Sequence, residues 1–156
     1  ILFQDHNLLP HLTVFDNVAL GLDPNLRLDT AQKTRVTQAL AETGLEGLEN
    51  RKPGQLSGGQ ISRAGLARVL LRARPLILLD EPFAALGPAL KRQMLDLVAR
   101  IVAETGATLM MITHDPEDAR HLCDLTLVVA EGVAHPPAPT QALLDNPPAV
   151  LKAYLG

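Results

Sequence analysis

The sequence predicts an α/β fold with a mostly parallel sheet. Residues 76–79 and 107–113 are short apolar runs, and polar residues follow each of them directly. Runs of this length and composition are typical of strands buried on both faces of a parallel sheet. Residues 30–43, 58–72 and 88–104 instead place apolar side chains at helical spacing. Helical segments placed between buried strands are the pattern of α/β proteins.

Local signals place the helix boundaries. Thr13 is expected to cap a short helix over residues 12–18. Either Asp29 or Thr30 is expected to cap the helix over residues 30–43, and Gly44 to end it. The remaining expected elements are the end of a buried strand at 1–3, a helix at 88–104 opened by Pro88 and ended by Gly106, a short helix at 116–123, a strand at 125–130 before a turn at Glu131-Gly132, and a last helix capped by Thr140.

Composition and charge restrict the function classes. The 156 residues are 47% apolar and 3% aromatic, which is enough for one domain with an aliphatic core. A net charge of −3 gives no indication of nucleic-acid binding. The single cysteine, Cys123, excludes an internal disulfide, and its apolar context predicts a buried, inert thiol. No apolar run approaches the roughly 18 residues of a membrane span.

The run Leu56-Ser57-Gly58-Gly59-Gln60 is the first candidate site. Ser57 is a good N-cap, because its hydroxyl can accept a hydrogen bond from a backbone N–H of the first helical turn. Gly58 and Gly59 have no side chains to keep a ligand from the first-turn N–H groups, and the helix dipole points its positive end the same way. These features predict an anion site for phosphate. The alternative is an ordinary capped helix start.

Asp80 and Glu81 form the second candidate site, at the carboxyl end of the run 76–79. Adjacent carboxylates point to opposite sides of a strand, so one can hold Mg²⁺ through water while the other faces a nucleophilic water. The alternative is a helix N-cap followed by a glutamate in a turn. Gln4 and His114 also follow predicted strands, at the sheet edge where ligands bind in open α/β sheets. Taken alone, each would more often be a structural or surface residue.

In their order and spacing, these motifs resemble the ATP-binding-cassette (ABC) ATPases. Residues 56–60 resemble the family signature sequence, and residues 76–81 resemble its Walker B strand. Gln4 resembles the Q-loop glutamine and His114 the switch histidine. The likeness spans nearly the whole chain. The segments most similar to the ATPase subunits of bacterial thiamine importers are residues 3–14, 20–28, 80–86 and 88–90.

The resemblance implies an ATPase that uses ATP and Mg²⁺. Glu81 would polarise the attacking water, and His114 would contact the γ-phosphate and steady the transition state. Gln4 and Asp80 would hold the Mg²⁺ shell. The residues that would bind the nucleotide are Gln4, Ser57, Gly58, Gly59 and Gln60. In the family, two subunits pair head to tail, so that each signature closes the nucleotide site of its partner.

The resemblance also implies an organisation and partners. Residues 10–73 would form an α-helical subdomain, and residues 1–9 and 74–156 the core subdomain, of one P-loop NTPase-type ABC ATPase domain. The function implied is ATP hydrolysis that energises a bacterial importer for thiamine. Partners would be a second ATPase subunit, integral membrane permease subunits that the first helical segments face and, indirectly, a periplasmic solute-binding protein. The protein would be peripheral to the cytoplasmic face of the inner membrane.

Departures from the family pattern leave alternatives open. No Gly-x-x-x-x-Gly-Lys-Ser/Thr occurs, so we expect an N-terminally incomplete domain that lacks half of its nucleotide site and is inactive as given. Gly87 stands where the family usually has Asp, Ile61-Ser62 where polar or basic residues are common, and Gly65 lies inside a predicted helix. The alternatives are an importer ATPase for another solute or ion and a non-hydrolysing dimerisation or coupling module. A DNA-repair or translation-type ABC ATPase is disfavoured, because we find neither a long insertion nor a tandem cassette.

Overall fold

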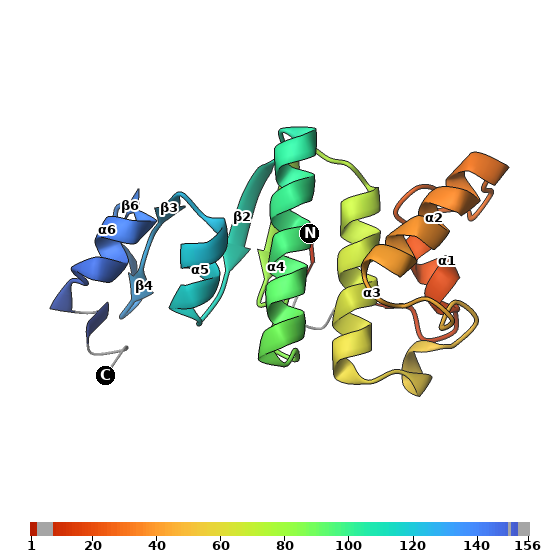
Figure 1. Cartoon of the computed structure of the whole chain (residues 1–156), viewed down its shortest axis with the longest axis horizontal. Helices are drawn as coiled ribbons and strands as arrows, with labels where there is room; N and C mark the ends of the chain where they lie inside the picture. Colours follow the sequence, from red (N-terminus) through yellow and green to blue (C-terminus); the bar gives the residue numbers. More distant parts are fainter. Residues whose placement is uncertain (3–7, 150, 153–156) are drawn as a thin grey trace. The chain divides into compact units, whose positions relative to one another are not determined.

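The computed structural model of the chain describes residues 1–2, 8–149 and 151–152. The chain forms two compact units, residues 1–112 and residues 113–156, and each is treated by itself below. Figure 1 labels their α-helices and most of their strands. One predicted site residue, Gln4, lies outside the described residues.

Helices α1, α2 and α3 make up the first part of the first unit. Helix α1 spans Val14–Ala19, α2 spans Thr30–Glu42 and α3 spans Gly58–Leu71. A short 3-10 helix, Pro53–Gln55, leads into α3. Each of these three α-helices begins at a polar N-cap whose side chain accepts a hydrogen bond from the first turn. Thr13 and Ser57 are the predicted caps, and Asp29 is one of the two residues that the sequence allowed for α2.

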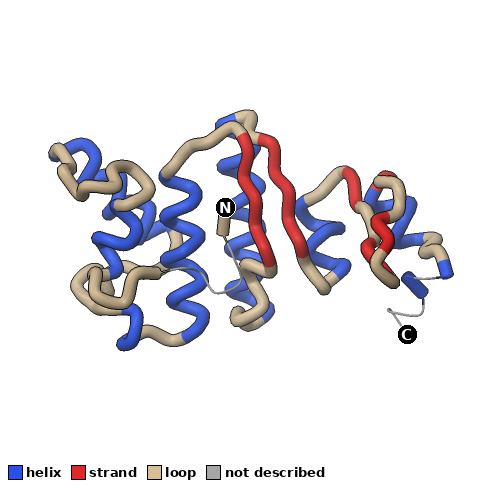
Figure 2. The backbone as a smooth tube through the Cα atoms, turned by 180° about the vertical axis from the view of Figure 1, so that it is seen from behind, coloured by secondary structure: helices blue, strands red, loops and turns tan. Residues whose placement is uncertain are grey.

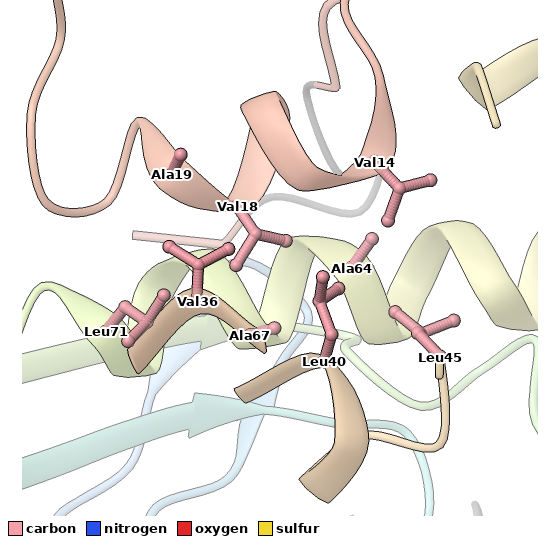
Figure 3. Close-up of a cluster of buried hydrophobic side chains, with 9 residues drawn as sticks. All are labelled: Val14, Val18, Ala19, Val36, Leu40, Leu45, Ala64, Ala67 and Leu71. Atoms are coloured by element: carbon pink, nitrogen blue, oxygen red, sulfur yellow. The ribbon is translucent and has the colours of Figure 1, made fainter. Parts of the chain in front are cut away.

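A closed aliphatic core holds these helices together (Figure 3). Its buried members are at most 9% exposed: Val14, Val18, Ala19, Val36, Leu40, Leu45, Ala64, Ala67 and Leu71. With six residues, α1 is far shorter than the roughly 12–15 residues that an isolated helix needs in water. Full burial of a Val or Leu side chain stabilises by roughly 1.5–3 kcal/mol. Burial against α2 and α3, rather than helix propensity, therefore holds α1 in place.

The second part of the first unit is a parallel strand pair with its crossover helix. Strand β1, Leu76–Asp80, pairs in register with β2, Thr108–Ile112. Helix α4, Pro88–Thr105, connects them, beginning after Gly87 and ending at Gly106, whose φ of 64° is in the left-handed region. At the other edge of β1, Leu2 forms a single parallel bridge with Leu79, where the sequence predicted the end of a strand.

The two strands are not buried on both faces, and here the sequence-based prediction was wrong. Ile77 and Leu79 are buried, whereas Leu76, Met110 and Ile112 are 51%, 53% and 54% exposed. Figure 2 shows β1 and β2 from the side on which no described element of their unit covers them, with α4 behind. An apolar run identifies a strand, but the coverage of its faces depends on elements distant in sequence.

The second unit begins with α5, Pro116–Leu122, and contains α6, Thr140–Asp145. The single strand predicted over residues 125–130 is instead divided into β3, Leu125–Thr126, and β4, Val129–Ala130. These pair antiparallel with different partners: β3 with β6 (Ala138–Pro139), and β4 with β5 (Val133–Ala134). The strand is divided because each half has its own partner.

Two turn and cap predictions in the second unit have different outcomes. The turn at Glu131-Gly132 is confirmed, with φ of 52° and 77°, as a two-residue hairpin turn requires. Thr140 does not cap α6, because it is the first helical residue and Pro139 holds the cap position. The Thr140 Oγ1 atom instead lies 2.8 Å from the Oγ1 atom of Thr126, which ties α6 to β3. In the described part of the chain, no helix is both long and apolar enough to cross a membrane.

Candidate functional site

The start of α3 is a capping box built from Ser57 and Gln60. The Ser57 Oγ atom accepts from the N–H of Gln60 at 3.3 Å, and the Gln60 Oε1 atom accepts from the N–H of Ser57 at 2.8 Å. A helix offers no intrahelical acceptors to its first N–H groups. The box uses those of Ser57 and Gln60, so the N–H groups of Gly58 and Gly59 are the donors that this helix end can offer to an anion. The predicted N-cap is confirmed, and Gln60 is part of the cap itself.

The same first turn packs closely against the loop that follows β1. A Cβ atom added to Gly59 would lie 3.1 Å from Leu86 Cδ2 and 3.4 Å from the carbonyl oxygen of Ala85. A Cβ atom added to Gly58 would lie 3.7 Å from the Cβ atom of Ala85. Even a Cβ atom at Gly59 would therefore require the Leu86 side chain to shift by a few tenths of an ångström. The two candidate sites thus lie on segments that contact each other.

Asp80 and Glu81 differ in backbone conformation. Asp80 is the last residue of β1, and its N–H donates to the carbonyl oxygen of Leu2 at 2.9 Å. Glu81 lies just beyond the strand with a φ of 43°, and its N–H donates to the carbonyl oxygen of Ile112 at 2.9 Å. Strand alternation therefore does not set the direction of the Glu81 side chain, contrary to the expectation from sequence.

The left-handed backbone at Glu81 is itself informative. This conformation costs a non-glycine residue roughly 1–3 kcal/mol and persists where the surrounding structure holds it in place. Here the hydrogen bond from Glu81 to β2 holds one side of the peptide. On the other side, the N–H of Ala84 approaches the carbonyl oxygen of Glu81 at 3.4 Å. Such residues cluster at active sites, which supports a functional role for Glu81.

His114 belongs to the second unit, just before α5, and its side chain is exposed. Its neighbours order the local backbone. The Thr113 hydroxyl donates to Asp118 Oδ2 at 2.8 Å and accepts from the N–H of Asp115 at 3.0 Å. Asp115 in turn caps α5 by accepting from the N–H of Glu117 at 3.0 Å. The predicted role of His114 beside Glu81 stays a prediction.

The residues proposed for Mg²⁺ are Gln4 and Asp80. Among the described residues, no group of three or more His, Cys, Asp or Glu side chains could hold a metal ion. Mg²⁺ commonly takes one or two carboxylates from the protein and completes its shell with water and substrate phosphates. The Asp80 carboxylate fits that arrangement, since it emerges at the carboxyl end of β1.

Two residues with extensive polar contacts were not among the predicted site residues. Arg63 donates to backbone carbonyl groups at the end of α2 and in the first turn of α3. Asn17 is fully buried and bonds to the backbone of residues 9, 12 and 13, which fixes the loop before α1. Asn17 lies three residues after Val14 and next to Val18, and this place on the apolar side of α1 is the signal that could have identified it.

The thiol of Cys123 is half-buried. Burial raises the pKa of this thiol, and the neighbouring Asp124 carboxylate raises the pKa further. A raised pKa keeps the thiol protonated near neutral pH and so makes it a poor nucleophile. This agrees with the prediction of an inert cysteine.

Comparisons with known proteins agree on one family. The ABC transporter family model matches residues 1–84. The thiamine import ATP-binding proteins of Ruegeria sp. (strain TM1040) and Cereibacter sphaeroides are each 60% identical over 156 residues, which cover 100% of this chain and 68% of each relative. The protein of the same name from Brucella suis biovar 1 is 50% identical over 157 residues and is covered to 65% of its length.

Solved structures give the same result. A dimeric, post-hydrolysis structure of an ATP-binding cassette bound to ADP and Pi is similar over 89% of this chain, with a TM-score of 0.80 and 32% identity. A second dimeric structure, of a bacterial ABC transporter cassette, has the same TM-score and identity. The chain spans 61% of each of these solved chains. The chain therefore belongs to the ABC transporter family and has the fold of its ATPase cassette.

Proposed function

We propose that the native protein containing these residues is the ATP-hydrolysing subunit of a bacterial thiamine importer. The observation that carries this proposal is the 60% identity, over all 156 residues, to relatives named as thiamine import ATP-binding proteins. The geometry of the strand end and of the helix start is compatible with phosphoryl transfer to water. Such a reaction depends mainly on positioning and on electrostatic stabilisation of the phosphates.

The end of β1 is where we place the hydrolytic chemistry. The Glu81 carboxylate polarises the attacking water and accepts its proton, while the hydrogen bond to Ile112 keeps the backbone of Glu81 in position. Asp80, with Gln4, holds the shell of a Mg²⁺ ion, which supplies charge neutralisation on the phosphates when bound. His114 donates to the γ-phosphate of the substrate.

The start of α3 is where we place phosphate binding across a dimer. The N–H groups of Gly58 and Gly59 point out of a capped helix end, where the helix dipole favours an anion. Ser57 and Gln60 line the same end. In a head-to-tail pair, this end closes the nucleotide site of the partner subunit. The dimeric form of both similar cassettes supports this arrangement.

The importer reading implies further partners. Membrane permease subunits would bind the ATPase dimer, and a periplasmic solute-binding protein would deliver thiamine to them. The ATPase would then be peripheral, on the cytoplasmic face of the inner membrane. The names of the relatives, which specify import, support this placement.

A specific observation favours a second candidate, a non-hydrolysing dimerisation or coupling module. Gly87 stands where the family usually has Asp, in the loop that links the two nucleotide sites of a dimer. The 156 residues also contain no Gly-x-x-x-x-Gly-Lys-Ser/Thr run, and this run supplies most backbone contacts to nucleotide phosphates in P-loop proteins. Residues 1–156 alone should therefore bind Mg-ATP more weakly than micromolar.

The experiment that separates the two candidates uses the native protein together with its permease in sealed vesicles. If the protein is an importer ATPase, Mg-ATP hydrolysis should rise when thiamine and its binding protein are added. Labelled thiamine should then be taken up. Hydrolysis that rises with a different solute would show that the transported molecule is not thiamine, and the ATPase role would still stand. No hydrolysis in an intact complex would favour the coupling module.

A further inference from the structure

Arg63, on the second turn of α3, joins two helices through backbone carbonyl groups. Its Nη1 atom donates to the carbonyl oxygens of Thr43 at 2.8 Å and Gly44 at 2.7 Å. Its Nε atom donates to the carbonyl oxygen of Gly59 at 3.3 Å. One half-buried guanidinium thus links the end of α2 to the first turn of α3, across about twenty residues of sequence.

The end of α2 is suited to receive this cation. The last carbonyl groups of a helix lack intrahelical donors, and the helix dipole places partial negative charge there. Gly44 has a φ of 65°, in the left-handed region that favours glycine. A Cβ atom at Gly44 would also lie 2.7 Å from Arg63 Nη1. The backbone therefore favours glycine at this position, and a side chain there would have to displace the tip of the Arg63 side chain.

In the first turn of α3, the peptide group between Gly59 and Gln60 is held from both sides. Its carbonyl oxygen accepts from Arg63 Nε, and its N–H donates to the Ser57 hydroxyl. This peptide adjoins the one that carries the Gly59 N–H, and the Gly58 N–H lies one peptide further along the same turn. The Ser57 contact lies within α3, whereas the contacts of Arg63 connect the first turn of α3 to the end of α2.

We propose that Arg63 is a positioning residue, which aligns the Gly58 and Gly59 amides for phosphate by anchoring the first turn of α3 to the end of α2. This inference rests on the proposed phosphate-binding role of that turn. The Arg63 side chain acts through the carbonyl groups it binds and is assigned no contact with substrate.

The first test replaces Arg63 in the native protein and measures two quantities. Arg63→Met keeps the aliphatic stem and removes all three hydrogen bonds. We expect hydrogen exchange at the Gln60 and Ile61 amides to accelerate about tenfold or more, because bonds to charged groups are among the stronger ones in proteins. We expect the KM for Mg-ATP to rise by a similar factor, with a smaller change in kcat. Arg63→Lys, which keeps the charge, should recover part of both losses.

A matched pair of glycine variants separates positioning from simple loss of stability. Gly44→Ala and Gly106→Ala impose the same backbone strain, since the φ angles are 65° and 64°. Nothing lies within 4 Å of a Cβ atom at Gly106, whereas at Gly44 the guanidinium is displaced. Gly44→Ala should therefore reproduce the effects of Arg63→Met, and combining the two should add little. Gly106→Ala should leave exchange at Gln60 and the KM unchanged.

The outcomes distinguish the inference from the function on which it rests. Unchanged exchange at Gln60 and Ile61 in Arg63→Met, or equal effects of Gly44→Ala and Gly106→Ala, would overturn the positioning role. If Arg63→Met does not fold, Arg63→Lys and the two glycine variants still test the positioning role of Arg63. An absence of ATP hydrolysis in the unmodified native protein would instead refute the proposed function. The exchange measurements would still test whether Arg63 holds the first turn of α3.

Discussion

The start of α3 and the end of β1 present opposite chemistry and are held in different ways. The helix start offers backbone donors, fixed first by a capping box whose partners are three residues apart. The strand end offers the carboxylates of Asp80 and Glu81, whose backbone N–H groups are held by Leu2 and Ile112, residues far away in sequence. The donor end is largely a local structure, whereas the acceptor end forms only when the strands pair.

This difference indicates where each end is sensitive. The capping box forms within the helix start itself, and distant parts of the chain act on it through the contacts of Arg63 with the end of α2. Glu81 carries a left-handed backbone that the pairing with β2 maintains. Changes to the Glu81 side chain should therefore alter chemistry, while changes to the strands around it should alter its position.

The largest expected effect is that of Glu81→Gln in the native protein. The amide keeps the shape of the side chain and loses its basicity. Turnover should fall by roughly 10²–10⁴-fold if Glu81 acts as a general base, with ATP binding preserved. Steady-state ATP hydrolysis and equilibrium nucleotide binding, measured on the same preparation, test both parts.

The matched control is Glu131→Gln. Glu131 also has a left-handed backbone, with a φ of 52°, but it lies in the hairpin turn between β4 and β5. The same chemical change at this residue should leave turnover within about twofold of the unmodified protein, as surface substitutions usually do. Undiminished turnover in Glu81→Gln would assign the base elsewhere.

The second prediction concerns subunits that carry different lesions. Gly59→Asp places a carboxylate where phosphate should bind, and Leu86 already lies close to that position. If the helix start acts on the partner's nucleotide, mixing Gly59→Asp with Glu81→Gln subunits gives dimers with one intact composite site and one doubly damaged site. Such dimers, purified by two different tags, should hydrolyse ATP faster than either mutant homodimer.

An arrangement within one subunit would leave a lesion in each site of the mixed dimer. Recovery would then be absent. Strict coupling between two sites could also prevent recovery, so nucleotide trapping at single sites is the second measurement. Trapping at one site per mixed dimer supports action across the dimer, and equal impairment of both sites contradicts it.

The same contrast explains which features the sequence could predict. Helix starts depend on residues a few positions away, so the caps Thr13 and Ser57 were predicted correctly and the cap of α2 was narrowed to Asp29 or Thr30. Strand burial was overestimated at Met110 and Ile112, because coverage of a sheet depends on distant elements.

Within the candidate site, the residue types were predictable from motif spacing, but their conformations were not. The left-handed backbone of Glu81 is held by its hydrogen bond to Ile112 of β2, a contact that no local pattern encodes. The contacts of Arg63 with Thr43 and Gly44 likewise needed the packing of α3 against α2. The placement of His114 beside Glu81 stays a prediction.

The smallest expected effect compares two helix caps of the same design. Ser57 and Asp29 each form a capping box with a glutamine three residues later, Gln60 and Gln32 respectively. Ser57→Ala and Asp29→Ala should each lower the free energy of unfolding by about 1 kcal/mol, measured by denaturant titration of the native protein. The stability losses should therefore be similar.

Their effects on nucleotide should nevertheless differ. Ser57→Ala loosens the turn that carries the Gly58 and Gly59 amides, so the KM for Mg-ATP should rise by about fivefold, the factor that corresponds to roughly 1 kcal/mol. Asp29→Ala frays the start of α2, at the end of that helix away from the Arg63 contacts, so the KM should stay the same. An equal rise in KM for both variants would mean that the Ser57 cap serves the fold alone, since stability would then account for the change.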